Sequence, residues 1–345
     1  MKTFKKHRDY GFFDQDIRLS KLSQLGDPLD RLNQGIEFEK FRIFLEDGLS
    51  KEPHGKGGRP PYDYVMMFKI MILQRYYNLS DDQAEFQIND RMSFMRFLNL
   101  SIADDVPDSK TIWLFRERLT NLELVEGLFS LFLNELESLN LIVNEGKIVD
   151  ASFVEVPRQR NSRAENQQIK DGVIPDRFEA NPHVKSQKDV DARWTQKNHV
   201  NYFGYKNHVK QDSGSKLIVN YAVTDACVHD SQVIGDLLNK NDAGEDLYAD
   251  SAYSGEPQKK IIAAKGMIEK VCEKGVRNRP LTDEQKASNK EKSKVRVRVE
   301  HIFGFMEMSM NQMYINCIGI KRAAAIIGLM NLTYNMCRKI QLIPI

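Results

Sequence analysis

Three carboxylates stand where an acid is unusual or where a ligand site is expected. Asp150 interrupts the apolar run 147–154, and a buried strand disfavours an acid without a partner. Asp250 ends a second predicted strand, and open α/β sheets place ligand sites at such strand ends. Glu300 lies on a predicted helix. Converging carboxylates repel one another unless a cation neutralises them, and hard oxygen ligands select Mg²⁺ or Mn²⁺.

The helix that carries Glu300 has an apolar stripe that predicts burial against a core. The stripe has three- and four-residue steps and consists of Val295, Val299, Ile302, Met306, Met310 and Met313. Arg296 and Glu300 share the neighbouring face, at the edge of this seam. The simpler alternative is an Arg296–Glu300 pair on a solvated face, since such pairs are common at this spacing.

The elements that must position these acids alternate between strands and helices. Strands are predicted at 147–154, 202–211, 216–224, 246–249 and 267–272, and helices at 229–239, 256–265, around Glu300 and at 321–340. Asp230 or Ser231 would cap the first of these helices. The order predicts a ribonuclease H-like α/β fold, a mixed five-stranded sheet flanked by helices. In this fold Asp150 and Asp250 lie on adjacent strands, and the Glu300 helix packs across them.

The region before this sheet is predicted to be all-α. Short amphipathic helices are expected at 17–49, 63–77, 91–98, 108–119 and 123–139, with a capping box from Ser80 to Gln83. We therefore divide the chain into an N-terminal helical segment (1–50) for oligomerisation or DNA contact, a basic Gly/Pro linker (51–61), a helical DNA-binding domain (62–140) and a catalytic domain (145–345). A plain helical bundle with ordinary surface charge is the alternative for 62–140.

A net charge of +2 conceals two basic stretches. Residues 258–298 hold thirteen basic side chains against five acidic ones, and residues 158–216 interleave basic and aromatic side chains, which suits a phosphate backbone and unstacked bases. A solvated loop is the alternative for either stretch. The expected DNA contacts are Arg59, Lys110, Arg116, Arg158, Arg160, Arg193, Trp194, Lys206, His208, Arg296 and Arg298.

Composition bounds the class of protein. The 345 residues are 41% hydrophobic and 28% charged, as expected for a globular protein of two or three domains. No apolar run approaches the ~20 residues of a membrane helix, and no secretory segment is recognised, so we expect a cytoplasmic, nucleoid-associated protein without a membrane partner. The four widely spaced cysteines indicate neither a zinc site nor a disulfide framework.

Seven segments together carry a resemblance to a known family. They are Val-Asp-Ala-Ser-Phe (149–153), Pro-Arg-Gln-Arg-Asn (157–161), Gln-Lys-Asp-Val-Asp-Ala-Arg-Trp (187–194), Tyr-Lys-Asn-His (205–208), Val-His-Asp-Ser (228–231), Tyr-Ala-Asp-Ser-Ala-Tyr (248–253) and Arg-Val-Arg-Val-Glu-His (296–301). The chain resembles the bacterial insertion-sequence transposases of the DDE type, in the group named for insertion sequence five. The N-terminal part resembles the family's helical DNA-binding domain less distinctively.

The resemblance implies roles for individual residues. It makes Asp150, Asp250 and Glu300 the catalytic acids that bind Mg²⁺, or Mn²⁺ in its place, as two ions. Arg296 matches the arginine of the family's Tyr–Arg–Glu–Lys signature, which would hold DNA phosphate. Two positions depart from the signature: Ser293 stands in place of its tyrosine and Glu307 in place of its lysine, for which Lys321 or Arg322 would substitute.

The implied activity is DNA transposition. It consists of metal-dependent cleavage at transposon ends and transfer of the 3′-hydroxyls into target DNA, without a covalent enzyme intermediate or ATP. The implied partners are double-stranded DNA, comprising terminal inverted repeats and target, and further copies of the chain in a homodimer or larger assembly. The alternatives are a nuclease of the same fold without strand transfer and a catalytically inert DNA-binding repressor.

Overall fold

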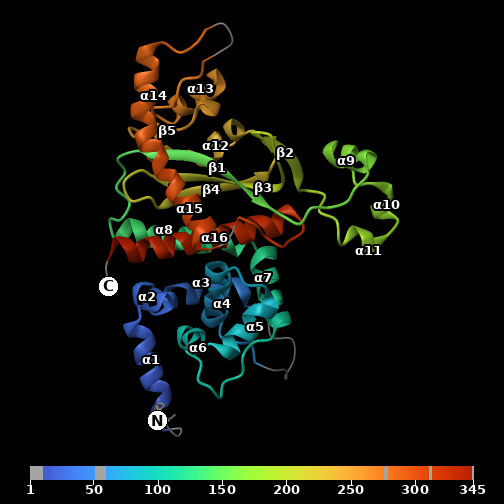
Figure 1. Cartoon of the computed structure of the whole chain (residues 1–345), viewed down its shortest axis with the longest axis vertical. Coiled ribbons are helices and arrows are strands. Elements are labelled where there is room, and N and C mark those ends of the chain that lie inside the picture. The colour runs from blue at the N-terminus through green and yellow to red at the C-terminus, as the bar shows by residue number, and fades with distance from the viewer. Residues whose placement is uncertain (1–10, 51–59, 276–278, 311–312, 344–345) are drawn as a thin grey trace, which may run out of the picture.

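The computed structural model of the chain describes residues 11–50, 60–275, 279–310 and 313–343. Figure 1 shows helices at the N-terminal end, a sheet above them, and a long C-terminal helix between the two. Most of the predicted linker, including Arg59, lies outside the described residues.

The N-terminal region is helical, as predicted. Its helices are α1 (Asp14–Gln24), α2 (Pro28–Gly35), η1 (Phe38–Phe41), α3 (Arg42–Leu49), α4 (Tyr64–Tyr77), α5 (Asp81–Asp90), α6 (Met92–Leu98), α7 (Ser109–Asn121) and α8 (Leu124–Ser138). The capping box of α5 is confirmed, because the Ser80 hydroxyl accepts from the Gln83 amide at 3.2 Å and the Gln83 side chain accepts from the Ser80 amide at 3.0 Å.

A mixed sheet follows, made of β1 (Lys147–Glu155), β2 (Arg193–Lys197), β3 (Val200–Asp212), β4 (Ile218–Asp225), β5 (Asp246–Tyr248) and β6 (Ile268–Glu269). The five predicted strands are arranged in the order β4-β3-β1-β5-β6. The β1–β3 and β3–β4 pairs are antiparallel, and the β1–β5 and β5–β6 pairs are parallel. This is the predicted ribonuclease H-like arrangement. The sixth strand, β2, forms a hairpin with β3 and is not among the strands predicted from the sequence.

The remaining helices connect and cover the strands. They are α9 (Arg163–Lys170), α10 (Asp176–Glu179), α11 (Pro182–Lys185), η2 (Asp230–Gln232), α12 (Ile234–Leu237), η3 (Lys240–Asp242), η4 (Ser251–Tyr253), α13 (Glu256–Ala264), α14 (Asp283–Arg296), η5 (Val297–Val299), α15 (Glu300–Met308) and α16 (Ile320–Leu342). The single helix predicted at 229–239 is wrong, since short segments replace it. Helices α9, α10 and α11 project away from the sheet (Figure 1).

Helix α16 joins the two halves of the molecule. It packs on β3 and β4 and also on α2, α4, α7 and α8, and Figure 1 shows it beside α8, between the sheet and the N-terminal helices. One hydrophobic cluster therefore runs from Leu29 to Cys337. A second cluster packs α12 and α13 against β1 and β5 through Val149 and Leu247. The core continues across the predicted boundary at 140–145, and that boundary stays a prediction.

Two further observations concern the helices and the thiols. Among the described residues, no helix is both long enough and apolar enough to traverse a lipid bilayer. All four cysteines carry free thiols, with Cys272 and Cys337 buried.

Candidate active site

Asp150 occupies the middle of β1, in the sheet interior. Its Oδ1 accepts a hydrogen bond from the Ala151 amide at 2.8 Å, and its Oδ2 lies 3.5 Å from the Arg296 guanidinium. Burial raises the pKa of Asp150 to about 6; the Ala151 amide and Arg296 lower it, and the charges of Asp250 and Glu300 raise it further. The ionised carboxylate is thus held in a place that disfavours its charge.

Asp250 follows the end of β5, on the strand beside β1. The parallel register pairs Lys147 with Leu247 and Ile148 with Tyr248, which brings the carboxyl end of β5 next to Asp150. The Asp250 carboxylate caps η4 by accepting from the Ala252 amide at 2.8 Å. The predicted placement of the two aspartates on adjacent strands is confirmed.

Glu300 begins α15 and remains exposed to solvent. Val299 and Ile302 on either side of it are fully buried, and η5 packs on β1, so the backbone at Glu300 is anchored next to the sheet. The expected single helix is divided here into α14, η5 and α15. Asp150 on β1, Asp250 after the paired strand β5 and Glu300 after η5 thus come from neighbouring elements of the fold.

Arg296 contacts Asp150 and has no ion pair with Glu300 in the described contacts. The simpler alternative, a helical pair on a solvated face, is therefore wrong. Arg296 is about a quarter exposed. Its guanidinium partly neutralises the acidic site and can still reach a phosphate from outside.

The three acids fit a divalent cation by their chemistry. All supply hard oxygen atoms. Burial is the main cause of the raised pKa of Asp150 and the charges of Asp250 and Glu300 add to it, so a bound cation would favour the ionised form of this carboxylate. Within the described residues, no group of three or more His, Cys, Asp or Glu side chains is already arranged closely enough to hold a metal ion.

A second charged pair lies beside the acids. The Lys206 ammonium donates to the Asp230 carboxylate at 2.8 Å and to the Val228 carbonyl at 2.7 Å, and lies 5.2 Å from the centre of the Phe153 ring. Asp230 is thus an ion-pair partner and not the predicted helix cap, because the His229 side chain accepts from the Ser231 amide instead.

Part of the predicted DNA-contact set is exposed. Arg158, Arg160 and Trp194 lie at the surface near the β2–β3 hairpin, and the Arg158 guanidinium sits 5.7 Å from the centre of the Trp194 ring. Lys110 on α7 and Arg298 in η5 are also exposed. Arg298 donates to the Ser213 carbonyl at 3.0 Å.

Other members of that set are engaged inside the protein. His208 is fully buried, with its Nε2 atom 2.9 Å from the Thr224 hydroxyl. Lys206 is buried on Asp230, Arg116 makes two bonds of 2.6 and 2.7 Å to Asp81, and Arg193 donates to backbone carbonyls. These placements argue against direct DNA contacts from His208, Lys206 and Arg116. Arg59 lies outside the described residues.

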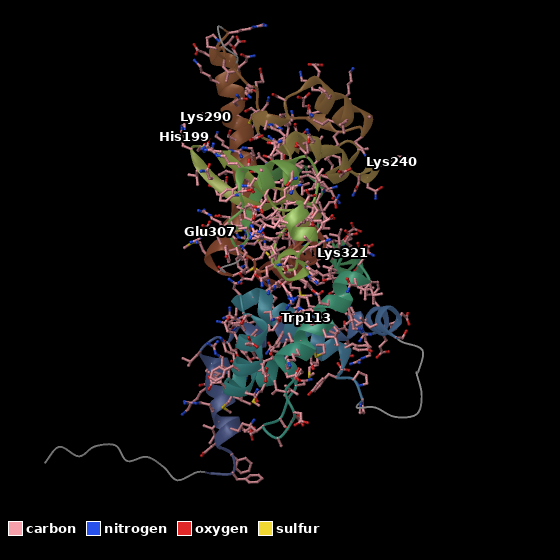
Figure 2. All side chains as sticks on the ribbon, turned by 90° about the vertical axis from the view of Figure 1, so that its right-hand side faces the viewer. Trp113, His199, Lys240, Lys290, Glu307 and Lys321 are labelled. Atoms are coloured by element: carbon pink, nitrogen blue, oxygen red, sulfur yellow. The ribbon has the colours of Figure 1, made fainter. Side chains whose placement is uncertain are left out.

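The positions that depart from the family signature can also be placed. Glu307 is exposed on α15, and Figure 2 shows it on one side of the molecule, with Lys321 toward the other. Arg322 binds Glu117 with contacts of 2.7–3.0 Å, and Lys321 lies 3.3 Å from Glu123. Arg322 thus pairs with α7, and Lys321 pairs with Glu123, which precedes α8. These ion pairs argue against the DNA contact that the signature lysine would make.

Trp113 is not among the residues selected from the sequence, although Lys110 and Arg116 on the same helix are predicted DNA contacts. Its indole is about half exposed and lines a cavity of about 710 Å³ between α7, the segment after β1 and the start of α16. Arg158 and Lys188 line the same cavity. The sequence does show a tryptophan among basic residues in the helix predicted at 108–119, and this combination could have indicated a DNA contact.

Comparison with known proteins places this geometry in a family. Residues 17–118 match the family described as Transposase domain (DUF772), and residues 143–336 match the family described as Transposase DDE domain. A solved structure similar to this chain is the cryo-EM structure of the piggyBac transposase synaptic complex with hairpin DNA, at 12% identity and a TM-score of 0.44, covering 92% of this chain and 75% of that chain. The second match covers more than half of the chain and includes all three acids, so the protein belongs to the Transposase DDE domain family.

Proposed function

We propose that the chain is a DNA transposase that cleaves at transposon ends and transfers the 3′-hydroxyls into target DNA. The observation that carries the proposal is the placement of three acids on neighbouring elements: Asp150 on β1, Asp250 just after the adjacent parallel strand β5, and Glu300 directly after η5, which packs on β1. Membership of the DDE family supports the same reaction class and implies use of a divalent metal.

Asp150, Asp250 and Glu300 would hold two Mg²⁺ ions, with Mn²⁺ able to replace them. When bound, such ions polarise a phosphodiester and stabilise the leaving oxygen. The protein's own contribution is to fix three carboxylates on two paired strands and one anchored helix. Arg296, beside Asp150, would hold a phosphate oxygen of the scissile DNA.

Both chemical steps are in-line displacements at phosphorus. In the first, a water oxygen attacks and the bond to the 3′-oxygen of the element end breaks, which leaves a 3′-hydroxyl. In the second, that hydroxyl attacks a target phosphodiester and displaces a target 3′-oxygen. The protein forms no covalent bond to DNA and consumes no ATP.

DNA would lie along the exposed basic surface near the site. Arg158, Arg160 and Trp194 beside the β2–β3 hairpin and Arg298 in η5 are candidates for the end-binding surface, and Lys110 is a candidate on the helical region 62–140. We assign catalysis to 145–345 and end recognition to 62–140. Two ends must react together, so a homodimer or larger assembly on DNA is part of the proposal.

The test is an assay with labelled element ends, a target plasmid and Mg²⁺. Wild-type protein should give nicked ends and joined products, and Asp250→Asn should give neither. Asp246→Asn, at the start of the same strand, is the matched control and should retain activity. Cleavage without joined products would identify a nuclease, and binding without cleavage by the wild type would contradict the proposal.

A further inference from the structure

The hydroxyl of Tyr253 is a buried polar group without a partner. The side chain is 1% exposed, and its oxygen is among the few buried side-chain atoms of the described residues that make no hydrogen bond. Leaving such a group unpaired costs about 1–3 kcal/mol, and most buried hydroxyls are paired. Phenylalanine would fill the same space without that cost, so the hydroxyl requires an explanation.

Tyr253 is linked to both aspartates, to Asp250 by its place in the chain and to Asp150 by packing. It ends η4, the short helix that the Asp250 carboxylate caps, and its ring packs in the same cluster as Val149, the neighbour of Asp150. Helix η2, which carries Asp230, packs on η4. The ring is thus fixed by packing, and its hydroxyl has little freedom to seek another acceptor.

The electrostatic surroundings suit a donor. Burial holds the pKa of Tyr253 well above its ordinary value, and the charges of Asp230, Asp150 and Asp250 act in the same direction. The phenol therefore keeps its proton, and its hydroxyl can donate a hydrogen bond to a carboxylate. Asp230 already receives the Lys206 ammonium at 2.8 Å, which leaves Asp150 and Asp250 as the acceptors that would benefit most.

We propose that Tyr253 is a positioning residue whose hydroxyl donates a hydrogen bond to Asp150 or Asp250 when a divalent cation loads the site. The inference rests on the proposed function, because it requires a metal bound by these acids. Carboxylates that ligate a metal are themselves oriented by outer hydrogen-bond donors, and losing such a donor typically costs about 10- to 100-fold in metal affinity. The unpaired Tyr253 hydroxyl would be such a donor to Asp150 or Asp250 in the metal-bound protein.

The experiment compares wild type with Tyr253→Phe, using Mn²⁺ alone as the probe. Calorimetric titration should give an affinity for Mn²⁺ about 10-fold weaker in the variant. Urea denaturation without metal should show the variant to be as stable as wild type or more stable, because an unpaired buried hydroxyl is removed. A residue with a purely structural role would not combine these two results.

Tyr205→Phe is the matched control. Tyr205 is also fully buried, but its hydroxyl donates to Asp189 at 2.7 Å. We expect this variant to lose stability without metal and to keep the wild-type affinity for Mn²⁺. The opposite signatures of the two variants separate positioning of the acids from general support of the fold.

A measurement on unmodified protein keeps the inference testable whatever the variant's folding. Adding Mn²⁺ should shift the near-ultraviolet tyrosine absorbance of wild type, because a buried phenol gains a charged acceptor. Absence of that shift, or wild-type Mn²⁺ affinity in Tyr253→Phe, would overturn the inference and leave the proposed function standing. Wild-type Mn²⁺ affinity in Asp250→Asn would instead overturn the metal site itself.

Discussion

At the scale of single residues, burial of the Asp150 carboxylate disfavours its charged form. Asp150 lies in the middle of β1, and among the described residues its ion-pair partner is Arg296. Strand β1 could accept an apolar residue at this place, as it does at Ile148 and Val149. Packing of the strand therefore does not explain the acid, whereas the proposed role of Asp150 as a metal ligand does.

Replacing Asp150 with asparagine should stabilise the metal-free protein. Its pKa rises from 3.8 to about 6 on folding, so the folded state holds a proton that the unfolded state releases between these values. The free energy of unfolding consequently falls as pH rises through that window and stays lower above it. At pH 7.5, urea denaturation of Asp150→Asn should show a gain of roughly 1–3 kcal/mol. A loss of stability would contradict the strained-acid account.

His208 should make the protein sensitive to acid. Burial lowers its pKa from 6.5 to about 4, with Asp230 opposing this shift and Lys206 adding to it. Below pH 6.5 the unfolded chain binds a proton that the folded chain excludes, so stability falls between pH 6.5 and 4 by about 1.4 kcal/mol per pH unit. Urea denaturation at pH 5 and 7.5 should show a smaller difference for His208→Gln. An equal difference in both proteins would refute this role.

At the scale of elements, the long helix α16 holds the sheet in place through polar contacts as well as apolar ones. Asn331 exchanges two hydrogen bonds with Asn207 of β3, at 2.7 and 3.1 Å. Asn335 accepts from the Ile218 amide at 2.9 Å and donates to its carbonyl at 2.8 Å. These contacts are buried and directional, so they fix the helix along the sheet as apolar packing alone would not.

Asn335→Leu should be strongly destabilising, because it leaves both backbone groups of Ile218 buried and unpaired. We expect a loss of about 2–4 kcal/mol in the free energy of unfolding, measured by urea denaturation. Gln341→Leu, on the exposed side of the same helix, is the control and should change stability by less than about 0.5 kcal/mol. Similar losses in the two variants would show that the paired amide is not the cause.

At the scale of the whole molecule, the N-terminal helices and the sheet share one core. Helix α16 is buried along most of its length between them, and the cluster that contains it spans both halves of the chain. Arg322 and Lys339 add ion pairs from α16 to Glu117 of α7 and Glu135 of α8. The N-terminal helices and the sheet are thus joined by one continuous core through α16.

The shared core predicts a single cooperative thermal transition for the full chain. Differential scanning calorimetry should give equal calorimetric and van't Hoff enthalpies, because neither half can lose its structure without exposing α16. Two separable transitions would instead indicate independent domains, as the division at 140–145 suggested.

Much of this fold is predictable from the sequence because periodicity is local. The strands around Asp150 and Asp250, the capping box at Ser80 and the buried final helix all follow from spacing and residue type. The failures have non-local causes. Asp230, in η2, pairs with Lys206 of β3, and β2 is stabilised by pairing with β3. Neither feature can be predicted from the residues next to it in the sequence.

The candidate site residues could be selected from the sequence, but their contacts could not. The type and position of Asp150, Asp250 and Glu300 could be read from the sequence, whereas the partner of Arg296 could not. The spacing of Arg296 and Glu300 favoured a pair along the helix, but packing of η5 on β1 brings Asp150 closer. The unpaired hydroxyl of Tyr253 is likewise visible only once the surrounding core is known.

If Asp150, Asp250 and Glu300 form one metal site, each of the three acids is needed for the binding of Mn²⁺. Electron paramagnetic resonance titration should show Mn²⁺ bound by wild type, and greatly weakened binding in each of Asp150→Asn, Asp250→Asn and Glu300→Gln, with Glu307→Gln as the unaffected control on the same helix. Wild-type affinity for Mn²⁺ in any one of the three acid variants would show that the substituted acid is not a ligand of the metal.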